Sequence, residues 1–288
     1  MNEKDLFRAI NGADDAQLLK SEKKPKRALR WIAACAALIV LVCAPIVSRK
    51  GMFQDEAAAA IAALEFQGAF YEACDHPDVL TRYGLPRQIT ADMAGEHLAY
   101  LQSDGGAGYE ETASVTDIEL YTYAPSPCRA VYVLRDGKNY MAALFCNPYQ
   151  FDTDTHMELG ELFRIYGVES AQDIASIAEI KFSGDLLDKV ISPIIDDAEV
   201  IEDFYRISTS QMSYGNDGFQ ELTFDGIPED EQVDVHQAFA DDNRTLRIET
   251  TDGLRFYIDV HPNFGWMDMA LSYYKMDSQM SAWFSTYF

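Results

Sequence analysis

The sequence predicts an α+β protein in which an N-terminal transmembrane helix is followed by an extracytoplasmic α+β domain. Residues 31–47 form a run of 17 amino acids without a charged side chain. The net charge changes sign across this run: residues 1–30 hold eight Lys/Arg against five Asp/Glu, whereas residues 51–288 hold 13 against 42. The acidic part mixes strand-like hairpins with separate helical stretches, which is typical of α+β domains rather than of strictly alternating α/β folds.

The apolar run, which Trp31 opens and Val47 closes, is only just long enough to cross a lipid bilayer. At ~1.5 Å per residue it spans about 26 Å, near the lower limit for a hydrocarbon core. Arg30, Trp31 and Arg49 flank the run and extend its reach, because long cationic side chains and an interfacial Trp anchor helices at the headgroups. We therefore expect a membrane helix over residues 31–48.

The distribution of basic residues predicts the orientation of this helix. Six Lys or Arg side chains lie between positions 20 and 30, whereas after Arg49 and Lys50 the next basic residue is Arg82. The positive-inside rule then predicts a single-pass protein of the cell membrane, with a cytoplasmic N-terminus and an extracytoplasmic C-terminal domain. A cleaved signal peptide and a buried core helix are the alternatives. The long stretch before the run favours an uncleaved signal-anchor, since signal peptides have short n-regions.

The cytoplasmic tail of residues 1–30 carries two apolar faces separated by a turn signal at Asn11-Gly12. Helices this short are marginal in water unless a partner covers their apolar side. Two interpretations stay open: a disordered leader that only sets topology, or a segment over residues 5–22 that folds onto a cytosolic partner. The side chains that would contact such a partner are Leu6, Phe7, Ile10, Leu18 and Leu19.

Three segments are expected after the membrane helix. Residues 49–74 are Ala-rich and helical in pattern, which predicts a stalk. Residues 75–182 and 183–288 are expected to form two small extracytoplasmic α+β units. The expected strands are 97–102, 115–123, 130–135, 140–146, 246–250 and 254–260, all rich in β-branched and aromatic residues. The expected helices are 78–83, 158–166, a short one that Ser170 and Asp173 cap, 196–212 and 277–287.

Two echoes indicate that these units are pseudo-repeats built on antiparallel hairpins. Asp136-Gly137 and Asp252-Gly253 each join two expected strands as a hairpin turn. Tyr83-Gly84 and Tyr166-Gly167 each end an expected helix, where glycine is favoured as the stop. Chance occurrence of common turn dipeptides is the alternative explanation.

The leader carries three short motifs ahead of the apolar run: Asp5-Leu6-Phe7-Arg8-Ala9-Ile10, Ala13-Asp14-Asp15 and Ser21-Glu22-Lys23-Lys24. It resembles the leader of uncharacterised single-pass membrane proteins from Gram-positive, clostridial-type bacteria, and residues 129–174 are similar to their outer domains. Members of this group are often treated as anti-sigma factors for extracytoplasmic-function sigma factors. The resemblance implies a tail that binds a sigma factor and an outer domain that senses. It implies no catalytic residue, and residues 1–30 lack the His and Cys of zinc-type anti-sigma domains.

No set of side chains in the sequence has the spacing of a familiar catalytic or metal site. The histidines form no His-x-x-x-His or His-Glu-x-x-His pair, and acidic pairs such as Asp241-Asp242 are more typical of helix caps than of acid/base dyads. The strongly acidic outer part disfavours nucleic acid as a partner, because its field repels phosphates. We predict no catalytic residue, no metal and no cofactor. The histidines are His76, His97, His156, His236 and His261.

Three cysteines lie outside the apolar run: Cys74, Cys128 and Cys146. A hairpin with a three-residue loop at 136–138 would place Cys128 opposite Cys146, whereas a two-residue loop would miss this pairing by one position. The sequence therefore leaves a disulfide between them open.

Together, these observations predict a membrane-anchored regulatory or sensory protein, an anti-sigma factor with a partner-binding tail and an outer domain for an unknown ligand. The alternative is a non-catalytic cell-surface binding module whose tail only sets topology. An enzyme has the least support, because no catalytic constellation accompanies the fold pattern.

Overall fold

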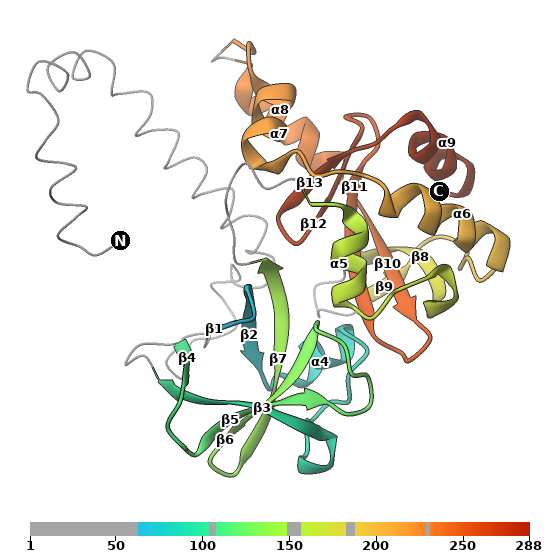
Figure 1. Ribbon diagram of the computed structural model, residues 1–288. Coiled ribbons are helices and arrows are strands. Elements are labelled where there is room, and N and C mark those ends of the chain that lie inside the picture. The colour runs from blue at the N-terminus through green and yellow to red at the C-terminus, as the bar shows by residue number, and fades with distance from the viewer. Residues whose placement is uncertain (1–62, 104–107, 149–156, 183–187, 229–230) are drawn as a thin grey trace, which may run out of the picture. The chain divides into compact units, whose positions relative to one another are not determined.

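The computed structural model describes residues 63–103, 108–148, 157–182, 188–228 and 231–288. These residues belong to one compact unit, Ala60–Phe288. They form a closed β-barrel followed by an open sheet with helices packed against it (Figure 1).

Seven strands close the barrel in the order β1-β2-β7-β6-β5-β3-β4. Neighbouring strands are antiparallel except β1 and β4, whose parallel pairing closes the barrel. Closure leaves no unpaired sheet edge, and alternate apolar side chains fill the interior. The strands are β1 (Ala63–Phe66), β2 (Ala69–Cys74), β3 (Ala94–Ser103), β4 (Gly108–Thr112), β5 (Ile118–Tyr123), β6 (Val131–Asp136) and β7 (Asn139–Pro148). Helix α4 (Pro77–Arg82) and the 3-10 turn η1 (Ala91–Met93) lie between β2 and β3.

The second sheet has six antiparallel strands in the order β13-β12-β11-β10-β8-β9. Its strands are β8 (Ile174–Phe182), β9 (Asp188–Val190), β10 (Arg244–Thr250), β11 (Arg255–His261), β12 (Trp266–Met269) and β13 (Ser272–Lys275). Strand alternation gives it two unlike faces. We call the face with Ile248, Phe256 and Ile258 the inner face; it is buried in the main core. The outer face carries the alternate side chains, among them Arg247 and Tyr257.

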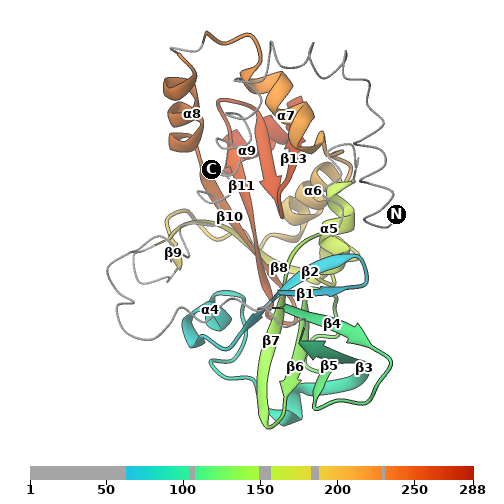
Figure 2. The same cartoon turned by 90° about the vertical axis from the view of Figure 1, so that its left-hand side faces the viewer.

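Helices cover both faces of this sheet. The inner-face helices are α5 (Leu159–Ile165), α6 (Ala198–Thr209) and α9 (Ser278–Tyr287), whose apolar side chains join the main core. Asp197 caps α6 by accepting two backbone N–H groups of its first turn, and Asp277 caps α9 by accepting the Met280 N–H. The helices α7 (Gly215–Phe224) and α8 (Gln232–Asp241) belong to a second apolar cluster with Trp266 on the outer face. Figure 2 shows α8 beside the β10–β11 hairpin.

Two helix ends join the barrel to the sheet. The Tyr83 carbonyl oxygen accepts a hydrogen bond from the Arg255 backbone N–H at 3.0 Å, and the Ile165 carbonyl oxygen accepts one from the Arg129 N–H at 2.9 Å. Glycine follows each helix with a positive φ, +78° at Gly84 and +79° at Gly167. At Gly84 an added Cβ atom would lie 2.0 Å from the Gly253 carbonyl oxygen, so only glycine fits this contact.

The predicted fold class is wrong. Residues 63–148 close into a barrel and the later residues form an open sheet, so the halves are not two copies of a small α+β unit. The predicted helical stalk is also wrong where it is described, because its residues 63–74 form β1 and β2. Leu64, Phe66 and Tyr71 are buried with the period of a strand, and Gln67 and Gly68 turn the hairpin with φ of +49° and +75°. The high alanine content of residues 49–74 favoured a helical interpretation, so the alternation of buried residues that is typical of a strand was not recognised.

The predicted membrane localisation is contradicted as well. Among the described residues, none of the helices is long and apolar enough to cross a bilayer. The longest of them, α6, has 12 residues, whereas a spanning helix requires about 20. The expected membrane segment 31–48, with Arg30, Trp31 and Arg49, lies outside the described residues.

The contact between Gly84 and Gly253 leads to a first prediction. Gly84→Ala should lower the free energy of unfolding by about 3 kcal/mol, since it adds both a left-handed backbone cost and a clash with the Gly253 carbonyl. Gly137→Ala is the matched control: Gly137 also has a positive φ, +60°, but nothing within 4 Å of its Cβ position. It should cost only about 1 kcal/mol. Urea unfolding measures both, and equal losses would contradict the close approach.

Candidate functional site

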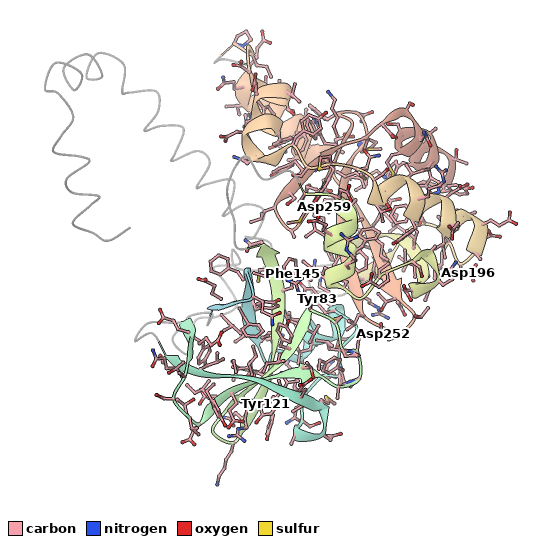
Figure 3. All side chains as sticks on the ribbon, viewed as in Figure 1. Tyr83, Tyr121, Phe145, Asp196, Asp252 and Asp259 are labelled. Atoms are coloured by element: carbon pink, nitrogen blue, oxygen red, sulfur yellow. The ribbon has the colours of Figure 1, made fainter. Side chains whose placement is uncertain are left out.

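The outer face of the second sheet carries a cluster of two carboxylates and a histidine: Asp259, His261 and Asp268. Asp259 and His261 lie on β11, and Asp268 lies on β12 directly opposite Asp259. Figure 3 labels Asp259 within the second sheet, apart from Tyr121 of the barrel. We call these three residues the Asp–His cluster. Like charges directly opposite each other on neighbouring strands destabilise the pair, so this placement requires a compensating partner.

Asp259 lies between a hydrogen-bond donor and a second carboxylate. The Thr245 hydroxyl on β10 donates to Asp259 Oδ1 at 2.5 Å. Burial, and after it the neighbouring charge of Asp268, raise the pKa of Asp259 to about 6, against the opposing effects of Thr245, His261 and Asn243. A carboxyl group in this position takes up a proton in a range where ordinary aspartates are fully ionised.

His261 connects the cluster to α8. Its Nδ1 lies 2.9 Å from the Phe239 carbonyl oxygen, and its Nε2 lies 3.2 Å from Asp268 Oδ2. Both partners are acceptors, yet a neutral imidazole carries a single N–H. Either a doubly protonated ring or a proton on Asp268 satisfies both contacts. In either case His261 Nδ1 donates to the Phe239 carbonyl oxygen of α8, and the second proton lies between His261 Nε2 and Asp268 on the sheet.

Helix α8 is attached to the sheet by few contacts. None of its residues is fully buried. The Phe239 ring stacks on the His261 ring with centroids 3.7 Å apart, and Asp242 just after the helix accepts a hydrogen bond from the Asn263 backbone N–H at 2.8 Å. A helix with so little buried surface can open locally at low free-energy cost, so changes in the Asp–His cluster bear directly on its docking.

The arrangement suits proton binding better than catalysis. His261 is only 4% exposed and both of its ring nitrogens contact protein acceptors, so neither is available to a substrate. Within the described residues, no group of three or more His, Cys, Asp or Glu side chains is placed to hold a metal ion.

Comparison of the chain with protein families, with curated proteins and with solved structures found no match in any of the three. The leader resemblance therefore stays a prediction, and the functional argument rests on the geometry of the described residues.

Of the side chains that the sequence singled out, the structure brings His261 into a site. The expected partner-binding residues Leu6, Phe7, Ile10, Leu18 and Leu19 lie outside the described residues, as does His156. The open question of a disulfide is answered: Cys128 is a free thiol, and burial raises its pKa. The β6–β7 pairing of Asp136 with Asn139 leaves a two-residue loop, which is the register that misses Cys146.

Sequence reasoning missed Asp259, Asp268 and Thr245. The available signal was an aspartate inside each of two short apolar segments, residues 256–260 and 266–269, where a carboxylate is unexpected. Recognising that they face each other also requires the register of β11 and β12, which the sequence alone did not reveal.

The raised pKa of Asp259 predicts the sign of a pH effect on stability. A folded-state pKa above the unfolded value stabilises the fold at low pH, and this contribution is lost as the pH rises from about 4 through about 6. Asp259→Asn mimics the protonated form. It should raise the free energy of unfolding at pH 7.5 by on the order of 2 kcal/mol and leave it nearly unchanged at pH 4.

Chemical unfolding of both proteins across this pH range measures the difference. Asp234→Asn is the control, because Asp234 is an exposed carboxylate on α8. A constant difference between wild type and Asp259→Asn at all pH values would contradict the assignment.

Proposed function

We propose that residues 63–288 form a non-catalytic sensory module of a regulatory protein, with the Asp–His cluster as its proton-responsive element. One observation carries the proposal: Asp259 and Asp268 lie opposite each other, and His261 links this pair to α8. A change in the protonation of Asp259 therefore acts on α8, a helix that few contacts hold against the sheet.

The response follows from the charges. Below the pKa of Asp259 its carboxyl is neutral and does not repel Asp268, whose Oδ2 lies 3.2 Å from His261 Nε2. Above that pKa two carboxylates face each other with one hydroxyl donor, Thr245, on Asp259. The repulsion weakens the docking of α8, so the α7–α8 segment opens more often as the pH rises.

The opened segment would present apolar side chains to a partner. The second apolar cluster holds Phe219, Phe224 and Trp266, with Phe239 of α8 packed against them. Opening α8 uncovers this cluster, which gives the protonation state a structural readout that another protein can recognise.

Hydrogen exchange tests this mechanism. Protection factors for the amides of residues 232–241, corrected for the intrinsic pH dependence of exchange, should fall about tenfold between pH 5 and pH 8. Asp259→Asn should abolish most of this fall, because its side chain does not ionise. The amides of α6 are the internal control and should keep their protection. Unchanged protection of α8 in the wild type would rule out the proposed response.

A second candidate function concerns the tail, and the leader motif supports it. We propose that residues 5–22 bind a sigma factor through apolar side chains that include Phe7 and Ile10. In a pull-down with the full chain as bait, the wild type should recover a sigma factor, and the double variant Phe7→Asp/Ile10→Asp should lose at least nine-tenths of it, since a carboxylate on the contact face costs about 2 kcal/mol or more. Gln17→Asp is the control for added charge. Equal recovery by all three baits would rule out the tail as the binding segment.

A further inference from the structure

A second polar cluster lies on the outer face of the sheet, at the end where α4 contacts it. Arg82 ends α4, Asp188 begins β9, and Arg247 and Tyr257 pair across β10 and β11. The side chains of Arg82, Asp188 and Arg247 are 17%, 6% and 11% exposed. The three ionic groups are thus largely withdrawn from water, where each polar atom needs a partner.

Several of these polar atoms lack one. Arg82 Nε, Arg247 Nε and Asp188 Oδ1 are buried without a hydrogen-bond partner in the described part of the chain. Arg82 Nε lies 4.0 Å from Asp188 Oδ1, and Arg247 Nη1 lies 3.7 Å from Asp188 Oδ2, both beyond a direct hydrogen bond. The Tyr257 hydroxyl lies 2.7 Å from Asp188 Oδ2, so Oδ1 is the oxygen left unpaired.

Other half-buried arginines of the described structure are used differently. Arg135 donates through Nη2 to Glu119 at 2.6 Å, although its Nε is also buried without a partner, and Arg244 donates through Nε to Glu179 at 2.6 Å. Each has a carboxylate of its own within hydrogen-bond distance. Arg82 and Arg247 instead share the more distant Asp188, and their Nε donors have no partner in the described structure.

The local charge is positive although the chain carries a formal charge of −24. Among the described residues, the ion pairs at this position join three arginines, Arg82, Arg247 and Arg255, to two carboxylates, Asp188 and Glu249, which leaves one positive charge in excess. The Arg82 guanidinium also lies over the Phe182 ring, 3.7 Å from its centroid, and this contact fixes its plane. A fixed, partly desolvated guanidinium pair with excess charge is suited to bind an oxyanion.

We propose that Arg82, Arg247 and Asp188 bind a small tetrahedral oxyanion that carries a hydroxyl proton, of which hydrogen phosphate is the simplest example. The two guanidinium groups donate to the anionic oxygens. Asp188 Oδ1 accepts the hydroxyl proton and repels an anion that has none. Phosphate meets this requirement at pH 6, whereas sulfate has the same shape but no proton to donate.

The site is distinct from the Asp–His cluster and shares no side chain with it. The oxyanion proposal goes beyond the sensory function, and either can fail without the other. The acidic average of the sequence, which disfavours phosphates, does not describe this position, because the described ion pairs there leave one arginine in excess.

Isothermal titration of the full chain at pH 6.0 and constant ionic strength tests the proposal. Inorganic phosphate should bind at least about tenfold more tightly than sulfate, the discrimination expected for one buried hydrogen bond made or missing. Phosphoserine, titrated alongside, separates two sources of the same group. Tighter binding than inorganic phosphate assigns a phosphate monoester as the ligand, and weaker binding assigns the free anion.

Two variants distinguish binding from a structural ion-pair role. Arg247→Met should lose phosphate binding, while Arg206→Met, which removes an exposed arginine of α6, should keep it. Asp188→Asn should bind sulfate and phosphate equally, because the amide offers an N–H where the carboxylate offered only acceptors. If Arg247→Met fails to fold, the Asp188→Asn comparison decides alone. Equal binding of both anions by the wild type, or binding of neither, would overturn the proposal.

Discussion

The junction between the end of α4 and the β10–β11 turn is the contact on which the rest of the structure depends. Gly84 approaches Gly253 backbone to backbone, and the Asp252 carboxylate in that turn accepts hydrogen bonds from Ser126 and Thr250. Figure 3 labels Tyr83 and Asp252 at this junction. The barrel interior and the inner face of the sheet consequently share one apolar core. Divided in two, each part would be a small domain with a correspondingly marginal core.

This arrangement also decides where polar groups can collect. The inner face is taken up by the shared core, so the polar side chains of β10 and β11 must point to the outer face. There α4 covers one end, bringing Arg82 to the sheet, and α8 covers the other end, bringing Phe239 to His261. Because α4 and α8 each cover only part of the outer face, the charged side chains there are partly shielded from water but not fully buried. Under such conditions pKa values shift and ionic groups retain unused donors.

Local features of the fold could be predicted from the sequence, and long-range ones could not. The Asp136-Gly137 and Asp252-Gly253 turns form hairpins, α5 ends before Gly167, and Ser170 and Asp173 form the expected capping box. These depend on residues only a few positions apart. Closure of the barrel instead requires β1 to pair with β4, about 45 positions later in the chain. Helix α8 gave no amphipathic signal, since none of its residues is fully buried.

The candidate site also combines local and long-range features. The sequence showed His261 as a histidine, but its role depends on Asp268 on the neighbouring strand and on Phe239 of α8, a helix that was not predicted. Arg82 lies within the expected helix 78–83 but was not singled out there, and Arg247 follows it by 165 positions. In each case the side chains meet because of the register between β10, β11 and their neighbouring strands. The pattern of apolar and polar residues specifies register only weakly on a sheet face that is polar.

The two clusters are close enough to influence each other. Thr245 and Arg247 are two positions apart on β10 and point to the same face, as do Tyr257 and Asp259 on β11, so the sites are about 7 Å apart. Charges at that distance interact by about 2 kcal/mol at an effective dielectric constant of about 20, less what salt screens. An ionised Asp259 therefore disfavours an anion beside Arg247, and by linkage a bound anion favours the protonated Asp259. The two sites share no side chain, but through this interaction the proton proposed to dock α8 would also strengthen the proposed oxyanion binding.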